Sequence, residues 1–262
     1  MKVLILGAGK MVEAILLGLQ NETDLSQYYV YSPSGKSAEL LSKKAGVHFV
    51  SSLDEVKDPA WVWLGCKPQQ LNDLAKLLNG KFPQATFLSM LAAISESEQR
   101  KILGVSKLVR IMPNLIVRFK KGITLISSQS ATEEIKHVQN LFSLLGLAQI
   151  VTESELEELT LLTGSGPALF YEFTKHLAAS FTSLSELERE NLARMVLSGS
   201  GVSLDSTSLG LDDLIGQVTS KAGVTIAVLQ EWRRLKLNDL IHDGIDAGKK
   251  RSAEISQNLR GS

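Results

Sequence analysis

The chain has little of several features that would point to a specialised environment. Its 262 residues include one cysteine, Cys66, so an internal disulfide is excluded and a reducing compartment is expected. Basic and acidic residues both number 28, so the basic excess of nucleic-acid-binding proteins is missing. Apolar runs are too short to cross a bilayer. We therefore expect a cytoplasmic protein that acts on a small molecule, without nucleic acid or membrane as its partner.

Obvious catalytic side chains are also scarce. The four histidines belong to no recognisable motif, so we expect structural or surface roles for them and predict no metal site. Cys66 follows an apolar run, which favours a small buried or cleft-wall residue over a nucleophile. Met1 and Lys2 lead directly into apolar residues, which leaves no room for a signal peptide.

The most informative pattern that is present lies in residues 3–19, where an apolar run, a glycine turn and a helical pattern follow one another. Gly7 permits a sharp turn, and Gly9 lets the backbone approach a pyrophosphate at the start of a helix opening at Lys10. The third position of the Gly-x-Gly-x-x-Gly/Ala pattern holds Val12. The pattern predicts a dinucleotide site. A strand-turn-helix whose glycines serve geometry alone is the alternative.

Strand and helix patterns alternate along the first half of the chain. They predict five or six parallel strands in a doubly wound sheet, completed by residues 122–126 and 148–151. Beyond Thr152 only helical periodicity remains. We therefore predict an α/β protein with a Rossmann-type NAD(P)-binding domain at 1–152 and an all-α domain for substrate binding and dimerisation at 153–262.

The second predicted strand, residues 28–31, ends without the acidic residue that would bind a ribose hydroxyl of NAD. Ser32, Ser34 and Lys36 follow it instead. Hydroxyls and a cation suit a ribose phosphate, so we predict NADPH, with NADH as the alternative. An ordinary turn with a solvated lysine would give the same pattern.

Two later strands end in turns that contain proline. These are Lys-Pro-Gln at residues 67–69 and Met-Pro-Asn at residues 112–114. The carboxyl ends of parallel strands meet at one edge of a sheet, so Gln69 and Asn114 could orient a nicotinamide there. Simple turns ended by proline are the alternative.

Two motifs lie in the helical half. Gly-Ser-Gly-Pro-Ala at residues 164–168 interrupts a helical pattern, which indicates either a kink beside a ligand or close packing at a dimer core. Residues 218–225 form a polar loop that leads into an apolar run. Its backbone N–H groups, with the hydroxyls of Thr219, Ser220 and Thr225, could hold a carboxylate.

These motifs, in this order, resemble the pyrroline-5-carboxylate reductase family over nearly the whole chain. The resemblance implies NAD(P)H-dependent reduction of the cyclic imine 1-pyrroline-5-carboxylate to L-proline, the last step of proline biosynthesis. It also implies a homodimer formed through the helical domain, with a higher oligomer as a further possibility. A related imine or short-chain oxo-acid reductase, or a non-catalytic nucleotide-binding paralogue, remains an alternative.

The resemblance further implies roles for individual residues. Cofactor contacts fall to Gly7, Gly9, Lys10 and Met11 at the pyrophosphate, to Ser34 and Lys36 at the adenosine end, and to Lys67, Pro68 and Asn114 at the nicotinamide. Thr225 and Ser220 would be catalytic, with Thr225 placed to hydrogen-bond the ring nitrogen. The substrate would be held by the rest of the loop: Thr219, Lys221, Ala222, Gly223 and Val224. The family usually has proline and glycine where this chain has Lys221 and Ala222.

Overall fold

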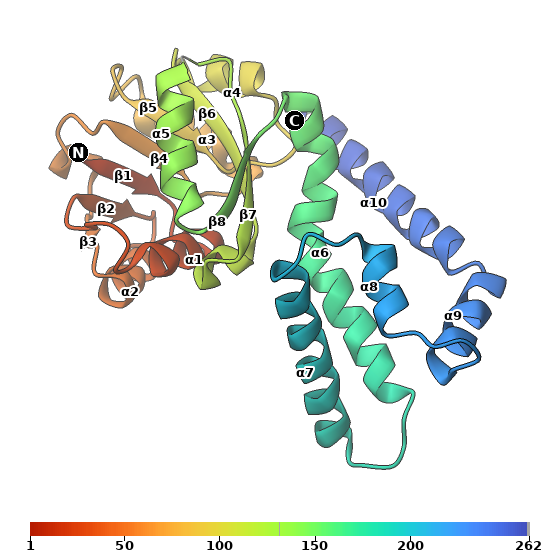
Figure 1. The fold of residues 1–262 in the computed structure, drawn as a ribbon. Coiled ribbons are helices and arrows are strands. Elements are labelled where there is room, and N and C mark those ends of the chain that lie inside the picture. Colours follow the sequence, from red (N-terminus) through yellow and green to blue (C-terminus); the bar gives the residue numbers. More distant parts are fainter. Residues whose placement is uncertain (131, 261–262) are drawn as a thin grey trace. The chain divides into compact units, whose positions relative to one another are not determined.

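The computed structural model describes residues 1–130 and 132–260 (Figure 1). The chain forms two compact units, one of residues 1–165 with the segment from Lys249 onward, the other of residues 166–248. The predicted division at residue 152 instead separates the last strand from the first long helix. The final two residues of the predicted second domain lie outside the described residues.

The first unit contains one sheet of eight strands, in the order β3-β2-β1-β4-β5-β6-β7-β8. Their bounds are β1 Val3–Leu6, β2 Tyr28–Tyr31, β3 His48–Phe49, β4 Trp61–Leu64, β5 Thr86–Ser89, β6 Leu108–Pro113, β7 Gly122–Ser127 and β8 Gly146–Ile150. The helices are α1 Lys10–Leu19, α2 Lys36–Ala45, α3 Leu71–Leu78, α4 Glu96–Leu103 and α5 Thr132–Ser143, with short 3-10 turns η1 Leu53–Glu55, η2 Pro68–Gln70 and η3 Leu115–Phe119.

Buried apolar residues cover both faces of this sheet. All residues of β1 and β4 are buried, as expected for parallel strands covered by helices on both sides. On one face Ile5 and Trp63 pack with Ile15 of α1, and on the other Leu4 and Val62 pack with Leu74 of α3. The predicted doubly wound fold is confirmed.

The last two strands depart from the predicted parallel arrangement. Strands β1 to β6 are parallel, but β7 pairs with β6 in the antiparallel direction, and β8 is parallel to β7. The reason is the short connection through η3, since a parallel crossover needs a dozen or more residues. A Cβ atom added at Gly122 would lie 2.4 Å from the side chain of Val117, which shows how tightly this connection folds back.

Helices form the rest of the chain: α6 Glu153–Ala179, α7 Glu186–Asp205, α8 Leu211–Gln217, α9 Val224–Arg234 and α10 Leu237–Arg260 (Figure 1). The predicted kink or break at residues 164–168 does not end the helix, because α6 continues past Pro167. None of the helices in the described part of the chain is long and apolar enough to span a membrane.

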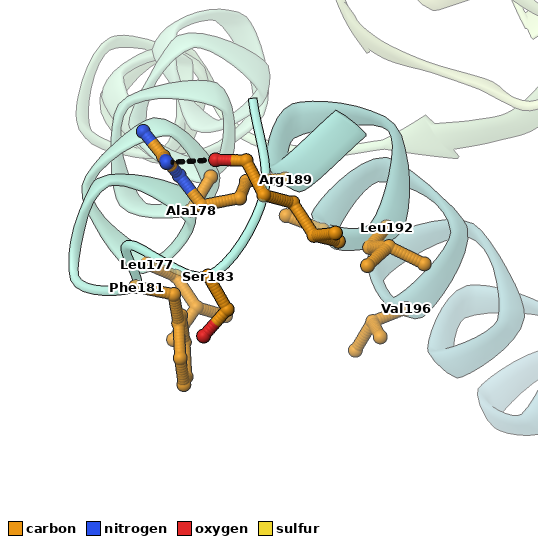
Figure 2. Close-up of a pocket in the computed structure, with 9 residues that line it drawn as sticks. Leu177, Ala178, Phe181, Ser183, Arg189, Leu192 and Val196 are labelled. Carbon is orange, nitrogen blue, oxygen red and sulfur yellow. Dashed lines mark hydrogen bonds between the residues drawn. The ribbon is translucent and has the colours of Figure 1, made fainter. Parts of the chain in front are cut away.

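The second unit has an apolar pocket of about 380 Å³ between the end of α6 and α7 (Figure 2). Leu177 and Phe181 line it from the α6 side, and Leu192 and Val196 line it from α7. Arg189 also lines the pocket, and its guanidinium donates to the carbonyl oxygen of Leu184. The pocket therefore offers apolar surface and few polar groups.

Candidate active site

The glycine turn after β1 has the geometry of a phosphate cradle. Gly7 has φ +114°, and a Cβ atom there would lie 2.6 Å from the backbone of Gly65 on the neighbouring β4 connection. The first backbone hydrogen bond of α1 runs from Glu13 N–H to Gly9 O at 3.0 Å. The N–H groups of Lys10 and Met11 therefore have no partner within the helix and can receive an anion.

Val12 occupies the position of the turn at which a small residue is usual. Its side chain is fully buried and fills the space that a side chain at residue 65 would need, since a Cβ atom on Gly65 would lie 2.3 Å from Val12 Cγ2. The missing glycine in α1 is thus offset by a glycine at the end of β4. The helix still packs closely on the sheet.

The adenosine edge follows β2. Ser32 is buried, and its hydroxyl oxygen lies 2.9 Å from Ser37 Oγ and accepts from the N–H of Ala38 at 3.3 Å. This hydroxyl therefore stabilises the start of α2. Its contact with the cofactor stays a prediction. Ser34 and Lys36 are exposed, and Lys36 is the first residue of α2 after Gly35, whose φ is +70°.

The connection after β4 carries Lys67 and Pro68. Lys67 is exposed, and its backbone N–H donates to Gln70 Oε1 at 2.9 Å, so Gln70 closes the turn that Pro68 begins. Cys66 beside them is half-buried, and burial raises the pKa of its thiol to about 11. A thiol that stays protonated at neutral pH is a poor nucleophile, in agreement with the sequence interpretation.

The side chain of Asn114 forms hydrogen bonds with backbone groups of the protein. Its Oδ1 accepts from the N–H groups of Ile116 and Ile123, and its Nδ2 donates to Thr163 O at 2.9 Å. Thr163 O is the carbonyl that residue 167 of α6 would bond, but Pro167 has no N–H. The asparagine after β6 thus compensates the proline inside α6, which joins two of the predicted motifs. Its contact with a nicotinamide stays a prediction.

Sequence reasoning missed the loop after β5, residues 90–95. It starts at the same edge of the sheet, between the connections after β4 and β6. Ala93 within it has φ +65°, which L-residues rarely adopt. The loop lacks the charged or amide side chains that drew attention to its neighbours. Its position after a buried strand was the signal that could have found it.

The polar loop of the second unit forms a tight turn before α9. Gly223 N–H donates to Ser220 O at 3.0 Å, and Ala222 at the third position has φ +59°. Positive φ at this position is characteristic of a type II turn, which normally has glycine there. A Cβ atom on Gly223 would lie 2.4 Å from Ser220 Oγ. The loop thus keeps a conformation suited to glycine although Ala222 replaces it.

The hydroxyl groups around this turn differ in their availability. Thr219 Oγ1 donates to Ile215 O at 2.9 Å and so belongs to the end of α8. Ser220, Lys221 and Thr225 are exposed. Gly223 precedes α9 without a side-chain cap, so the first N–H groups of this helix are free to bind a carboxylate.

The sheet edge and the glycine turn define a Rossmann-type dinucleotide-binding protein. Residues 2–93 match a family model described as NADP oxidoreductase, coenzyme F420-dependent, and residues 153–255 match one described as pyrroline-5-carboxylate reductase dimerisation. A pyrroline-5-carboxylate reductase of Staphylococcus epidermidis is 31% identical, with 98% of each chain covered. The chain therefore belongs to the pyrroline-5-carboxylate reductase family, which confirms the resemblance found in the motifs.

Solved structures share the fold of this chain. A pyrroline-5-carboxylate reductase of Coxiella burnetii matches with a TM-score of 0.87 and 23% identity, over 97% of each chain. A 1-pyrroline-5-carboxylate reductase of Streptococcus pyogenes matches with a TM-score of 0.82 and 25% identity, over 96% of this chain and 98% of that one. A Plasmodium falciparum pyrroline carboxylate reductase with NADP bound matches with a TM-score of 0.81 and 19% identity, over 97% of this chain and 98% of that one.

Proposed function

We propose that this protein reduces 1-pyrroline-5-carboxylate to L-proline with NADPH. The observation that carries the proposal is the match to a reductase that is 31% identical over 98% of both chains, because it spans the nucleotide turn and the polar loop alike. The NADP in the Plasmodium structure and the NADP oxidoreductase family model support NADPH as the cofactor.

The cofactor lies along the carboxyl edge of the sheet in this proposal. The backbone of Gly7 and Gly9 and the free N–H groups of Lys10 and Met11 hold its pyrophosphate. Ser34 and Lys36 bind the ribose phosphate, because both side chains are exposed at the N-terminus of α2. Lys67, Pro68 and Asn114 belong to the nicotinamide side. When bound, NADPH supplies the hydride that reduces the C=N bond.

The substrate binds at the turn before α9. The N–H groups of Val224 and Thr225 face its carboxylate, and the adjacent Thr219, Lys221, Ala222 and Gly223 shape the loop. Ser220 and the Thr225 hydroxyl hydrogen-bond the ring nitrogen, directly or through water. Hydride addition to the imine carbon of the protonated imine leaves a neutral amine, which takes a proton from solvent at neutral pH. Positioning of the reactants therefore supplies most of the catalysis.

The working form in this proposal is a cytoplasmic homodimer joined through the helices from Glu153 onward. The match to a dimerisation family model supports the assembly. The unpaired Cys66 is compatible with a reducing cytoplasm.

The test is steady-state oxidation of NADPH by the purified protein with 1-pyrroline-5-carboxylate, with proline identified as the product. Thr225→Ala should lower kcat about 10- to 100-fold, in the range of a lost catalytic hydrogen bond, and leave NADPH affinity unchanged. Thr182→Ala is the matched control, since this exposed threonine lies in the connection between α6 and α7 and belongs to no part of the proposed site. Absence of turnover in a wild-type protein that binds NADPH would point to another imine or oxo-acid, or to a non-catalytic paralogue.

A further inference from the structure

The loop of residues 90–95 lies at the part of the sheet edge that the nicotinamide would reach. The strand order β2-β1-β4-β5 puts the adenosine half of a dinucleotide at β2 and its other half at β4 and β5. This placement rests on the proposed function. Because Ala93 has φ +65°, the loop needs contacts from outside to keep its conformation.

Arg110 supplies a charged group beneath this loop. It lies in β6 and is 1% exposed, and its neighbours in register are Ser89 of β5 and Ser127 of β7. These small side chains leave room for the guanidinium on that face of the sheet. Its Nη1 lies 2.7 Å from Glu153 Oε1 and its Nη2 lies 2.7 Å from Glu157 Oε1, both on α6. A buried arginine is tolerated because it is paired in this way.

The same guanidinium contacts the loop near its start and is linked to its end through Glu153. At the start, Arg110 Nη2 donates to Leu91 O at 3.5 Å. At the end, Glu153 Oε1, which Arg110 holds, accepts from the backbone N–H of Glu96 at 2.6 Å. Glu96 is the first residue of α4, where the helix dipole favours a carboxylate. Within the described part of the chain, the side chain of Glu157 binds Arg110 and makes no hydrogen bond to the loop.

We propose that Arg110 is a positioning residue for the nicotinamide half of the cofactor. It holds residue 91 directly and residue 96 through Glu153, and so fixes the loop between them. A purely structural arginine would stabilise the fold without distinguishing the two halves of a dinucleotide. A positioning arginine affects the nicotinamide half selectively.

The experiment compares two truncations one helical turn apart. Glu153→Ala and Glu157→Ala each remove one carboxylate from Arg110, but only Glu153 reaches the end of the loop. Arg110→Lys is a third variant, which keeps the charge and loses the planar fork. Calorimetric titration measures the affinity of each protein for NADPH and for adenosine 2′,5′-bisphosphate, which contains the adenosine half alone.

The expected result is selective. Glu153→Ala and Arg110→Lys weaken NADPH binding about tenfold, equivalent to roughly 1.4 kcal/mol. Both leave the affinity for the bisphosphate within about twofold of the wild-type value. Glu157→Ala leaves the affinity for both ligands within about twofold of the wild-type value. Its melting temperature falls, as in the other two variants. Equal weakening of both ligands, equal effects of the two truncations on NADPH, or unchanged NADPH affinity in Glu153→Ala would each overturn the proposal.

The titrations need no turnover, so the two proposals can fail separately. A wild-type protein that binds NADPH but leaves 1-pyrroline-5-carboxylate unreduced would count against the proposed function alone. A wild-type protein that binds NADPH no more tightly than the bisphosphate would overturn the role of Arg110, since there would be no nicotinamide contribution to position.

Discussion

The two units of the chain bury very different amounts of apolar surface. In the first unit, two clusters of large aliphatic and aromatic side chains cover both faces of the sheet. Within residues 166–248, the buried side chains are Thr174, Ala178 and Ala193, and none is larger than threonine. The first unit has a core of its own, whereas the helical unit has almost none.

The composition of α6 shows what the helical unit needs. Leu169, Phe170 and Tyr171 follow one another on the helix, so their side chains point in three directions about 100° apart, yet each is more than 50% exposed. A stretch of helix that presents large apolar side chains in several directions is normally covered by other protein. A second copy of the chain, as the dimerisation family model implies, is the partner that can cover it.

The largest expected effect is a loss of association through the helical unit, with the first unit left folded. Phe170 is 60% exposed in one chain, and Phe170→Asp should weaken the proposed dimer about 100-fold, or roughly 3 kcal/mol, because it would place a charge in an apolar interface. Sedimentation equilibrium measures the dissociation, and titration with NADPH checks that the nucleotide unit stays folded. Leu40→Asp, at an exposed leucine of α2, is the control and should leave the dimer intact. A dimer of normal affinity in Phe170→Asp would place this face outside the interface.

The second effect is a loss of stability that is confined to the first unit. Gly65→Ala should cost about 1–3 kcal/mol of stability, because the new methyl group would meet Val12 Cγ2. In the background Val12→Ala the same substitution should cost clearly less, since the space is then free. Thermal unfolding of the four proteins gives the coupling energy. Additive effects would mean that residues 12 and 65 do not share this space, while dimerisation of Gly65→Ala should stay normal in either case.

The same contrast explains how much the sequence could predict. The parallel strands, α1 and its glycine turn follow from local patterns, because each strand is buried by its own neighbours. Val12 stands out in the sequence as an exception to the glycine pattern, but its complement Gly65 follows the neighbouring strand β4, far along the chain, and local spacing cannot reveal it. The hydrogen bond from Asn114 to Thr163 and the ion pairs of Arg110 are also long-range contacts. In the candidate site, the turn and the polar loop were found, whereas residues 90–95 carry no distinctive side chains.

A smaller effect sharpens the comparison inside the helical unit. An L-residue in the left-handed region costs about 1–2 kcal/mol, and glycine loses about 0.5–1 kcal/mol of entropy on folding, so Ala222→Gly should stabilise the turn by roughly 0.5 kcal/mol. Ala227→Gly, inside α9, should instead destabilise by about 1 kcal/mol. Denaturant unfolding at fixed protein concentration measures both. If both substitutions lowered the free energy of unfolding, the positive φ of Ala222 would carry no strain.

The smallest effect concerns pH and the first unit. His137 of α5 stacks on Trp61 with ring centres 5.1 Å apart, and burial lowers the pKa of His137 below its usual value. The unfolded chain therefore binds a proton more readily than the folded one, so this histidine's contribution to stability is present above about pH 6.5 and is lost as the pH falls. The side chain of His137 is only partly buried, so solvent screening keeps the change small. Melting followed by tryptophan fluorescence from about pH 7.5 to about pH 5.5 should show a slightly shallower decline in His137→Phe, which keeps the stacked ring and cannot titrate. Identical slopes in both proteins would assign the acid sensitivity to other groups.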